Sequence, residues 1–398
     1  MNKKVSLGVT ISIAAIAAAI TFILTMTFSM DVFNTKVQGL SEREEMYNKL
    51  EKLDNLVRSK YVGAIDEKSL LDGIAAGYVS GLNDKYAHYY SIDDYEDQKL
   101  GSDGYTVGIG VTVTKEESGY ISVVSVTNGS PAAEAGILVG DVIVGVDGED
   151  VLALGYDAAV KRVRGVEGTT VSIVVRREGE DTSLNVARKK IDIVSSYGEM
   201  IEGDVGYVRI TEFNGATPTQ FETAVSDLIQ QGAKAFLFDV RDNRGGTVNS
   251  VAEILDYLLP KGVLATAVYK DGTETVLHES DEERQLDLPM TILVNGNTAS
   301  AAELFAAAIR DFDKGELVGE TTYGKGVMQE TYSLEDGSGV TITVAQYNPP
   351  KSGNYDGVGL KPDYEAASPA SLSESSPDKQ TDPQFKKGLE VLRAAMAD

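Results

Sequence analysis

The pattern of apolar and polar positions changes character along the chain, and each change predicts a different kind of element. Residues 5–30 form an apolar run without a charged side chain. Between residues 40 and 100, apolar positions recur at three- and four-residue steps among charges, which is typical of amphipathic helices. The pattern therefore predicts an apolar helix within residues 1–30 and a helical arm at residues 31–100, which would suit dimerisation.

A mostly β domain is predicted for residues 101–190. Short β-branched runs alternate there with turn sequences such as Asn128-Gly129 and Asp147-Gly148. Strands are expected at Val107–Thr114, Tyr120–Thr127, Asp141–Val146 and Thr170–Arg176, with a helix at Tyr156–Arg164. A domain of about 90 residues is of ordinary size.

From residue 191 to 366, predicted strands alternate with predicted helices, so the chain as a whole is expected to be a multidomain α/β protein. The expected strands are Val205–Thr211, Ala235–Val240 and Met290–Val294, and the expected helices are Thr219–Gln231, Val248–Leu259 and Ser300–Arg310. Residues 367–398 are expected to form a linker rich in Ser, Pro and Asp, followed by a short helix at Phe385–Met396.

The N-terminal apolar run also predicts a location. As a helix, residues 5–30 would extend about 39 Å, more than the ~30 Å hydrocarbon core of a membrane. Lys3 and Lys4 precede the run and favour a cytoplasmic N-terminus. We therefore expect a transmembrane signal anchor at residues 1–30 and a single-pass protein of the cell membrane, with its catalytic portion outside the cytoplasm. Cleavage of a signal peptide near Ala15-Ile16-Ala17 is the alternative.

Composition narrows the chemistry. The 398-residue chain has no cysteine and only two histidines, His88 and His278, so neither a thiol nucleophile nor a His-rich metal site can be built. We expect no cofactor and no metal. The formal net charge of −25 argues against nucleic acid as a partner, because phosphates require a basic face.

The segment GSPAAEAGILVGDVIVGVDGEDV (Gly129–Val151) resembles a PDZ domain of the bacterial type. Upstream, TVGIGVTV (Thr106–Val113) resembles the carboxylate-binding loop of that family. The resemblance implies that a peptide with a free C-terminus binds at Gly108, Ile109, Gly110 and Val111. In isolation, the two glycines would equally well mark a β-bulge.

Three segments resemble the carboxyl-terminal processing (tail-specific) protease family. They are FDVRDNRGG (Phe238–Gly246), NGNTASAAELFAAAIRD (Asn295–Asp311) and GETTYGKGVMQ (Gly319–Gln329). The resemblance runs from about residue 40 to the end and implies a crotonase-like α/β core of spiral ββα units. It further implies a serine endopeptidase that cleaves extracytoplasmic proteins near or from their C-termini, with the substrate tail captured by the PDZ domain.

The resemblance assigns Ser300 as the nucleophile, Lys325 as the general base and Gln329 as the residue that orients the lysine. Ser300 would lie in the positive field at a helix N-terminus, although it could equally be a simple N-cap. Lys325 can act as a base only if burial lowers its pKa from about 10.4 to roughly 7–8. A generic lysine in a glycine turn would instead be solvated. A neutral amide at position 329 would not raise that pKa, as a carboxylate would.

The oxyanion hole implied by the resemblance consists of the backbone N–H groups of Gly246 and Ala301. Family members commonly have proline before the two glycines, where this chain has Arg244. Asp239 and Arg241 are expected to hold this loop rather than to react. Arg164, at the end of the PDZ helix, is a candidate gating residue; a surface charge without a role is the alternative.

Rival functions make different predictions. A catalytically idle, membrane-tethered PDZ adaptor is the main alternative, and it predicts disrupted Ser, Lys and Gln positions, whereas all three are intact. A Ser-His-Asp triad has little support, because neither His88 nor His278 lies in a motif. Acyl-thioester chemistry on a crotonase-type core would require a cytoplasmic, nucleotide-binding enzyme.

Overall fold

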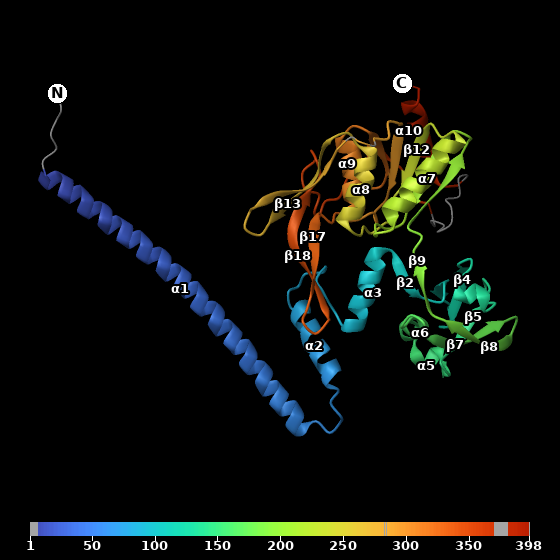
Figure 1. Ribbon diagram of the computed structural model, residues 1–398, viewed down its shortest axis with the longest axis horizontal. Helices are drawn as coiled ribbons and strands as arrows, with labels where there is room; N and C mark the ends of the chain where they lie inside the picture. Colours follow the sequence, from blue (N-terminus) through green and yellow to red (C-terminus); the bar gives the residue numbers. More distant parts are fainter. Residues whose placement is uncertain (1–6, 282, 284, 370–380, 398) are drawn as a thin grey trace. The chain divides into compact units, whose positions relative to one another are not determined.

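The computed structural model describes residues 7–281, 283, 285–369 and 381–397, which divide into two compact units after Ile74. The first unit contains α1 (Leu7–Lys60), a single helix of 54 residues, and the start of α2 (Glu67–Ser80) (Figure 1). The Arg58 guanidinium binds the carboxylates of Asp54 and Glu67, so one side chain joins the end of α1 to the start of α2.

The predicted transmembrane anchor is wrong. Among the described residues, no helix is both long enough and apolar enough to cross a membrane. α1 does not end with the apolar run but continues to Lys60 through a charged segment. The predicted single-pass location at the cell membrane is therefore wrong as well. Lys3 and Lys4, which set the predicted orientation, lie outside the described residues.

The second unit begins with the end of α2, followed by β1 (His88–Tyr90) and α3 (Ile92–Asp103). Ser91 caps the N-terminus of α3, since its hydroxyl accepts a hydrogen bond from the Asp94 N–H, and Gly104 in a left-handed conformation caps the C-terminus. The strand β1 pairs with β18 (Gly339–Asn348). This short strand interrupts the helical arm that the pattern predicted for residues 31–100.

The mostly β region after α3 forms one six-stranded sheet and one two-stranded sheet. The larger sheet consists of β3 (Val111–Lys115), β4 (Ile121–Val126), β5 (Val142–Val146), β6 (Glu149–Asp150), β7 (Thr170–Arg177) and β8 (Glu180–Ala187). The smaller one pairs β2 (Tyr105–Gly108) with β9 (Lys189–Asp192). Three helices accompany them, α4 (Pro131–Glu134), α5 (Val151–Leu154) and α6 (Tyr156–Val163). The strand predicted at Val107–Thr114 is broken at Gly110, which has φ +85°.

The α/β region is built on a six-stranded sheet in the order β10-β11-β12-β15-β16-β19. All neighbouring pairs are parallel except β10 and β11. The strands are β10 (Ser196–Ile201), β11 (Val205–Ile210), β12 (Ala235–Asp239), β15 (Met290–Val294), β16 (Gly315–Gly319) and β19 (Tyr364–Glu365). The helices are α7 (Thr217–Gln231), α8 (Val248–Leu258), α9 (Ala301–Asp311) and α10 (Pro383–Ala395).

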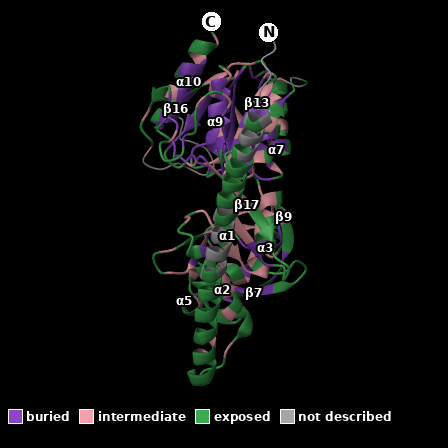
Figure 2. Ribbon diagram, turned by 90° about the vertical axis from the view of Figure 1, so that its left-hand side faces the viewer, coloured by how far each residue is buried: buried purple, intermediate pink, exposed green. Residues whose placement is uncertain are grey.

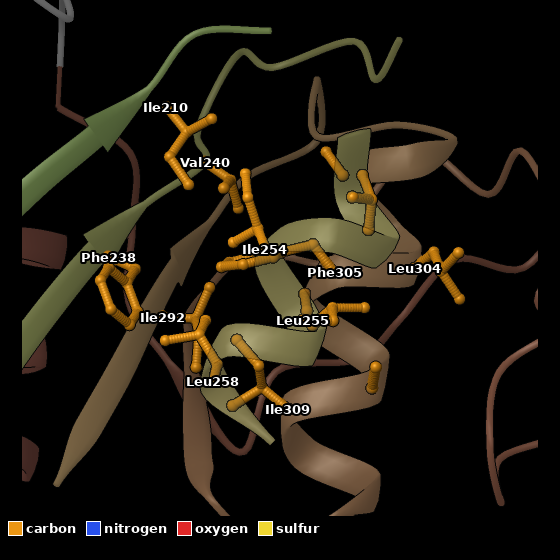
Figure 3. Close-up of a cluster of buried hydrophobic side chains, with 14 of the residues drawn as sticks. Ile210, Phe238, Val240, Ile254, Leu255, Leu258, Ile292, Leu304, Phe305 and Ile309 are labelled. Carbon is orange, nitrogen blue, oxygen red and sulfur yellow. The ribbon is translucent and has the colours of Figure 1, made fainter. Parts of the chain in front are cut away.

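Both faces of this sheet are covered. In β12, Phe236 and Phe238 join the cluster that contains residues of α7, α8 and α9, whereas Ala235 and Leu237 join the cluster that contains residues of α10. Because successive side chains of a strand point to opposite faces, a continuously apolar strand requires cover on both sides. Figure 2 shows the buried residues concentrated here, and Figure 3 shows side chains of α8 and α9 gathered against those of the sheet.

A second sheet completes the region, in the order β1-β18-β13-β14 with β17 also paired to β18. Its further strands are β13 (Gly262–Tyr269), β14 (Glu274–Ser280) and β17 (Val327–Ser333).

Candidate active site

Ser300 lies where the turn after β15 meets helix α9. Its backbone has φ 58° and ψ −123°, a conformation that is rare for a residue with a β-carbon and costs on the order of 1–3 kcal/mol. A residue that only caps a helix normally has an extended backbone. Ser300 also lines a cavity of about 890 Å³. The strained turn therefore suggests a role beyond capping.

A buried carboxylate, that of Glu303, joins the serine segment to the lysine segment. Its Oε2 accepts hydrogen bonds from the backbone N–H groups of Ser300, at 2.9 Å, and of Lys325, at 2.8 Å. Its Oε1 accepts from the Gly324 N–H at 2.8 Å and from the Thr322 hydroxyl. One fully buried side chain thus fixes two segments that are distant in the sequence.

The double-glycine loop lies directly against the serine turn. The Ala299 N–H donates to the Asn243 carbonyl at 2.9 Å. A β-carbon on Gly245 would lie 2.9 Å from the Ser300 Cβ, and one on Gly246 would lie 2.0 Å from the Phe213 carbonyl oxygen. Both glycines also have positive φ, 100° and 140°. Only glycine fits at these two positions.

Two backbone donors beside the serine are free. The Gly245 N–H donates to the Asn243 Oδ1 at 2.8 Å. By contrast, the N–H groups of Gly246 and Ala301 have no acceptor within the described parts of the chain. Free N–H groups next to a nucleophile are what an oxyanion hole requires.

Lys325 is half-buried immediately before β17. Its Nζ lies 4.3 Å from the centroid of the Tyr86 ring and has no hydrogen-bond acceptor among the residues the structure describes. Burial lowers the pKa of the Lys325 amine below its ordinary value; Asp84 and Glu303 oppose this effect, and Lys85 adds to it. The amine is therefore the kind of desolvated lysine that a general base requires.

The glycines on either side of Lys325 permit a close approach of backbone. A β-carbon on Gly326 would lie 2.7 Å from the Asp356 nitrogen, and one on Gly324 would lie 2.8 Å from the Gly359 nitrogen. In addition, the Tyr347 hydroxyl donates to the Lys325 carbonyl at 3.0 Å. The lysine backbone is thus held from both sides.

Gln329 does not contact the lysine amine. Its Nε2 donates to the Thr343 hydroxyl at 3.1 Å and to the Val327 carbonyl at 3.3 Å. The pairing of β17 with β18 shifts register between Met328 and Gln329, so the strand is irregular here. Nevertheless Gln329, Lys325, Ser300 and Gly246 all line the 890 Å³ cavity, whereas neither histidine does.

Asp239 and Arg241 lie beneath the loop and are fully buried. The Asp239 carboxylate pairs with Arg241 at 2.7 Å and with Arg209 at 2.6 Å. Arg241 also pairs with Asp382 at 2.6 Å. Neither Asp239 nor Arg241 lines the cavity. Their contacts hold the end of β12 and the loop that follows it.

A second cavity, of about 610 Å³, lies in the mostly β region. It is lined by the four residues of the predicted carboxylate loop, Gly108, Ile109, Gly110 and Val111, and by Arg164 at the end of α6. A β-carbon on Gly110 would lie 2.2 Å from the Ser130 Cβ, whereas one on Gly108 would meet nothing within 4 Å. Only the second glycine of the pair is sterically required.

Glu303 and Tyr86 are site residues that the sequence analysis missed. The spacing of Ser300 and Glu303, Ser-x-x-Glu, is the capping-box pattern and could have indicated a carboxylate bound to the serine N–H. Tyr86 belongs to the segment between α2 and β1 and reaches the lysine only through the tertiary fold. No local pattern marks it.

Comparison with known proteins gives three family matches. The Peptidase family S41 model matches residues 204–366, the PDZ domain model residues 107–187, and the model described as the activating protease CtpB N-terminal domain residues 14–93. The carboxy-terminal processing protease CtpA of Bacillus subtilis (strain 168) is 33% identical over 361 residues, which cover 89% of this chain and 76% of that protein.

Two further similarities agree with these matches. A CtpA-like serine protease of Staphylococcus aureus (strain N315) is 32% identical over 362 residues, 90% of this chain and 72% of that protein. A crystal structure described as an S41 protease from Bacteroides fragilis NCTC 9343 matches with a TM-score of 0.50 and 19% identity, over 85% of this chain and 92% of that one, and so supports the fold alone.

Fold, family models and relatives together define a serine-type peptidase with a PDZ domain. The chain belongs to the carboxy-terminal processing protease family, within peptidase family S41. The resemblance drawn from the three sequence segments is therefore confirmed.

Proposed function

We propose that this protease cleaves protein substrates near or at their C-termini, with Ser300 as the nucleophile and Lys325 as the general base. The observation that carries the proposal is the Glu303 carboxylate, which accepts hydrogen bonds from the backbone N–H groups of both residues at 2.9 and 2.8 Å. A carboxylate shared in this way keeps the two residues in one site even though they lie on different segments.

In the proposed reaction, the neutral Lys325 amine accepts the hydroxyl proton of Ser300 while Oγ attacks the scissile carbonyl carbon. The negative charge that develops on the carbonyl oxygen is stabilised by the N–H groups of Gly246 and Ala301. The Lys325 ammonium then gives its proton to the leaving amine. The neutral Lys325 amine next takes a proton from the water that attacks the acyl-enzyme ester, and it returns this proton to the Ser300 Oγ as the ester bond breaks.

The Lys325 amine must move before it can react. It lies over the Tyr86 ring, 4.3 Å from the ring centroid, so the proposed cycle begins with rotation of the lysine side chain toward Ser300. Gln329 donates through its Nε2, which leaves its carbonyl oxygen to accept from the arriving amine. This is the orienting role that we propose for Gln329.

The PDZ groove is proposed to bind the C-terminal carboxylate of the substrate at Gly108–Val111. Arg164 lines the same groove at the end of α6 and is exposed. We therefore propose that Arg164 senses the bound tail and gates the protease. Unchanged peptide-stimulated activity in an Arg164→Ala variant would contradict that role.

The working division of the chain is a helical arm at residues 31–100, a PDZ domain at 101–190, a protease core at 191–366, and a linker with a C-terminal helix at 367–398. The arm is proposed as a dimerisation element, since α1 and α2 expose large apolar side chains such as Leu56 and Tyr78. Sedimentation analysis of the chain with and without residues 1–74 tests this.

The experiment that tests the proposed function compares wild type with Ser300→Ala and Lys325→Ala on an unstructured polypeptide that ends in a free carboxylate. Both variants are expected to lose hydrolysis. The same polypeptide with a C-terminal amide is the matched control for tail capture and is expected to be cleaved more slowly by wild type. Cleavage retained by Ser300→Ala contradicts the assignment.

A further inference from the structure

Arg244 is an exposed basic residue of the active-site cavity. It lies between Asn243 and the double glycine, is exposed, and lines the 890 Å³ cavity together with Ser300 and Gly246. None of its donors has a partner within the described part of the chain. A guanidinium carries five donors in a planar fork, so all of them remain available to a ligand.

The backbone on both sides of Arg244 is fixed. Asn243 is fully buried, and its Nδ2 donates to the Ile210 carbonyl at 3.1 Å. The N–H after Arg244, that of Gly245, donates back to the Asn243 Oδ1 at 2.8 Å. Gly246 has no room for a β-carbon. Only the Arg244 side chain is therefore free to adapt, and it projects from a rigid loop beside a free N–H donor.

The other charged residues of the cavity are of both signs. Lys99 lies over the Tyr95 ring at 4.6 Å, and Glu212 accepts a hydrogen bond from Asn214. Asp103, exposed at the end of α3, is the remaining acid that lines the cavity. Three of the five charged lining residues are thus basic, in a chain with 61 acidic and 36 basic residues. The first residues of α8 also line the cavity, and their N–H groups add to the positive field.

We infer that Arg244 is a specificity-determining residue that binds a carboxylate of the substrate within a few residues of the scissile bond. This inference rests on the proposed function, because it takes Ser300 as the point of attack. A guanidinium binds a carboxylate through two parallel hydrogen bonds, which fixes the orientation as well as the charge of the bound group. Arg244 would thereby set the register of the peptide.

The carboxylate has two sources in a polypeptide. It is either the side chain of an Asp or Glu near the scissile bond or the free C-terminus itself when cleavage occurs close to the end. Both present the same planar anion to Arg244, so geometry alone does not separate them. The two sources can be separated with peptide substrates that differ at a single group.

The experiment measures kcat/KM for peptides in which Asp replaces Asn at each position flanking the scissile bond in turn, and for each peptide as the C-terminal acid and the amide. For wild type we expect the carboxylate form to be favoured about five- to tenfold at one position, as for a partly desolvated charged hydrogen bond. Arg244→Gln is expected to bring that ratio close to one, and Arg244→Glu to invert it. Because each enzyme variant is compared on two peptides, a loss of activity that affects both peptides equally cancels in the ratio of their kcat/KM values.

The outcome also identifies the source. A preference for Asp over Asn that Arg244→Gln removes identifies an acidic side chain. A preference for acid over amide that it lowers identifies the C-terminus, since Arg244 does not line the PDZ groove. Lys99→Gln is the matched control, since Lys99 lines the same cavity, and it is expected to keep the wild-type ratio. Ratios that are unchanged in Arg244→Gln, or that Lys99→Gln removes equally, overturn the inference. Hydrolysis that persists in Ser300→Ala refutes the proposed function instead, whatever the ratios.

Discussion

Arg241 and Lys325 are both basic residues withdrawn from water, but their surroundings are opposite. Arg241 is fully buried and pairs with Asp239 at 2.7 Å and Asp382 at 2.6 Å. Burial disfavours its charge, yet the two carboxylates outweigh burial and raise the pKa of Arg241. Lys325 faces the Tyr86 ring without a paired carboxylate, and burial lowers the pKa of its amine.

The comparison distinguishes a cation that holds structure from one that is suited to proton transfer. A buried charge with carboxylate partners keeps its proton and stabilises the segments that it joins. A partly buried amine without such a partner gives its proton up more easily. Mutation of Arg241 should therefore affect mainly stability, whereas mutation of Lys325 should affect mainly catalysis.

The largest effect is expected for Lys325→Ala. Loss of a general base should lower kcat/KM by about 10²- to 10⁴-fold while the protein stays folded. Lys325→Arg is the matched control, because a guanidinium keeps the charge but does not release a proton near neutral pH, and it should be equally inactive. Both variants are tested by initial rates of hydrolysis of a peptide that ends in a free carboxylate, and their folding is checked by thermal unfolding. An active Lys325→Arg enzyme would contradict the proposed base.

Arg241→Ala should act mainly through stability. Removing one partner of a buried ion-pair network leaves the Asp239 charge incompletely compensated, and the free energy of unfolding should fall by about 3–5 kcal/mol. Arg176 offers a matched control because it pairs with Asp181 at 2.7 Å on the surface, and Arg176→Ala should change stability little. Urea unfolding measures the free energy of unfolding of both variants. An equal decrease in Arg241→Ala and Arg176→Ala would contradict the structural role of Arg241.

Glu303→Gln should uncouple the serine from the lysine. An amide keeps one acceptor oxygen and turns an NH₂ group toward N–H donors, so we expect kcat to fall about 10- to 100-fold. Because the Glu303 charge raises the pKa of Lys325, its removal should also move the acidic limb of the rate profile to lower pH. Packing alone would not produce that shift. A wild-type kcat and pH profile would argue against the coupling.

The smallest effect is expected for Lys85→Gln. The Lys85 charge lowers the pKa of Lys325, so its loss should raise that pKa and move the acidic limb of kcat/KM to higher pH. The reacting form is the neutral amine, which is populated above its pKa. Lys99→Gln should leave the limb in place, since Lys99 does not act on Lys325. The pH dependence of kcat/KM measures this shift. A shift of the acidic limb to lower pH in Lys85→Gln would contradict the prediction.

The sequence predicted three strands of the α/β sheet, β11, β12 and β15, which are buried along their whole length. It did not predict β10, β16 or β19. The predicted strand at Ala235–Val240 appears as Ala235–Asp239, buried on both faces. The hairpin of β13 and β14 was missed, because the first residues of β14, Glu274, Thr275 and Val276, are all exposed and show no alternation of buried and exposed positions. The predicted N-terminal anchor was wrong, because no helix among the described residues is both long enough and apolar enough to cross a membrane.

The residues of the candidate site that lie in a sequence motif could be predicted, whereas those brought into the site only by the tertiary fold could not. Ser300, Lys325 and Gln329 lie in short, recognisable segments, and the cavity contains all three. Tyr86 lies outside these segments, and Glu303, although it lies in the same segment as Ser300, is marked only by its capping-box spacing. What sets the pKa of the lysine, its burial and the charges around it, comes from segments far apart in the chain. Only the tertiary structure reveals them.

The most direct test of the account is an NMR titration of the Lys325 side chain in the folded Ser300→Ala variant, with and without a tail peptide. The account predicts that Lys325 loses its proton at a lower pH than an ordinary lysine, whose pKa is about 10.4. If Lys325 titrates like an ordinary lysine in both states, it is not the base that activates Ser300.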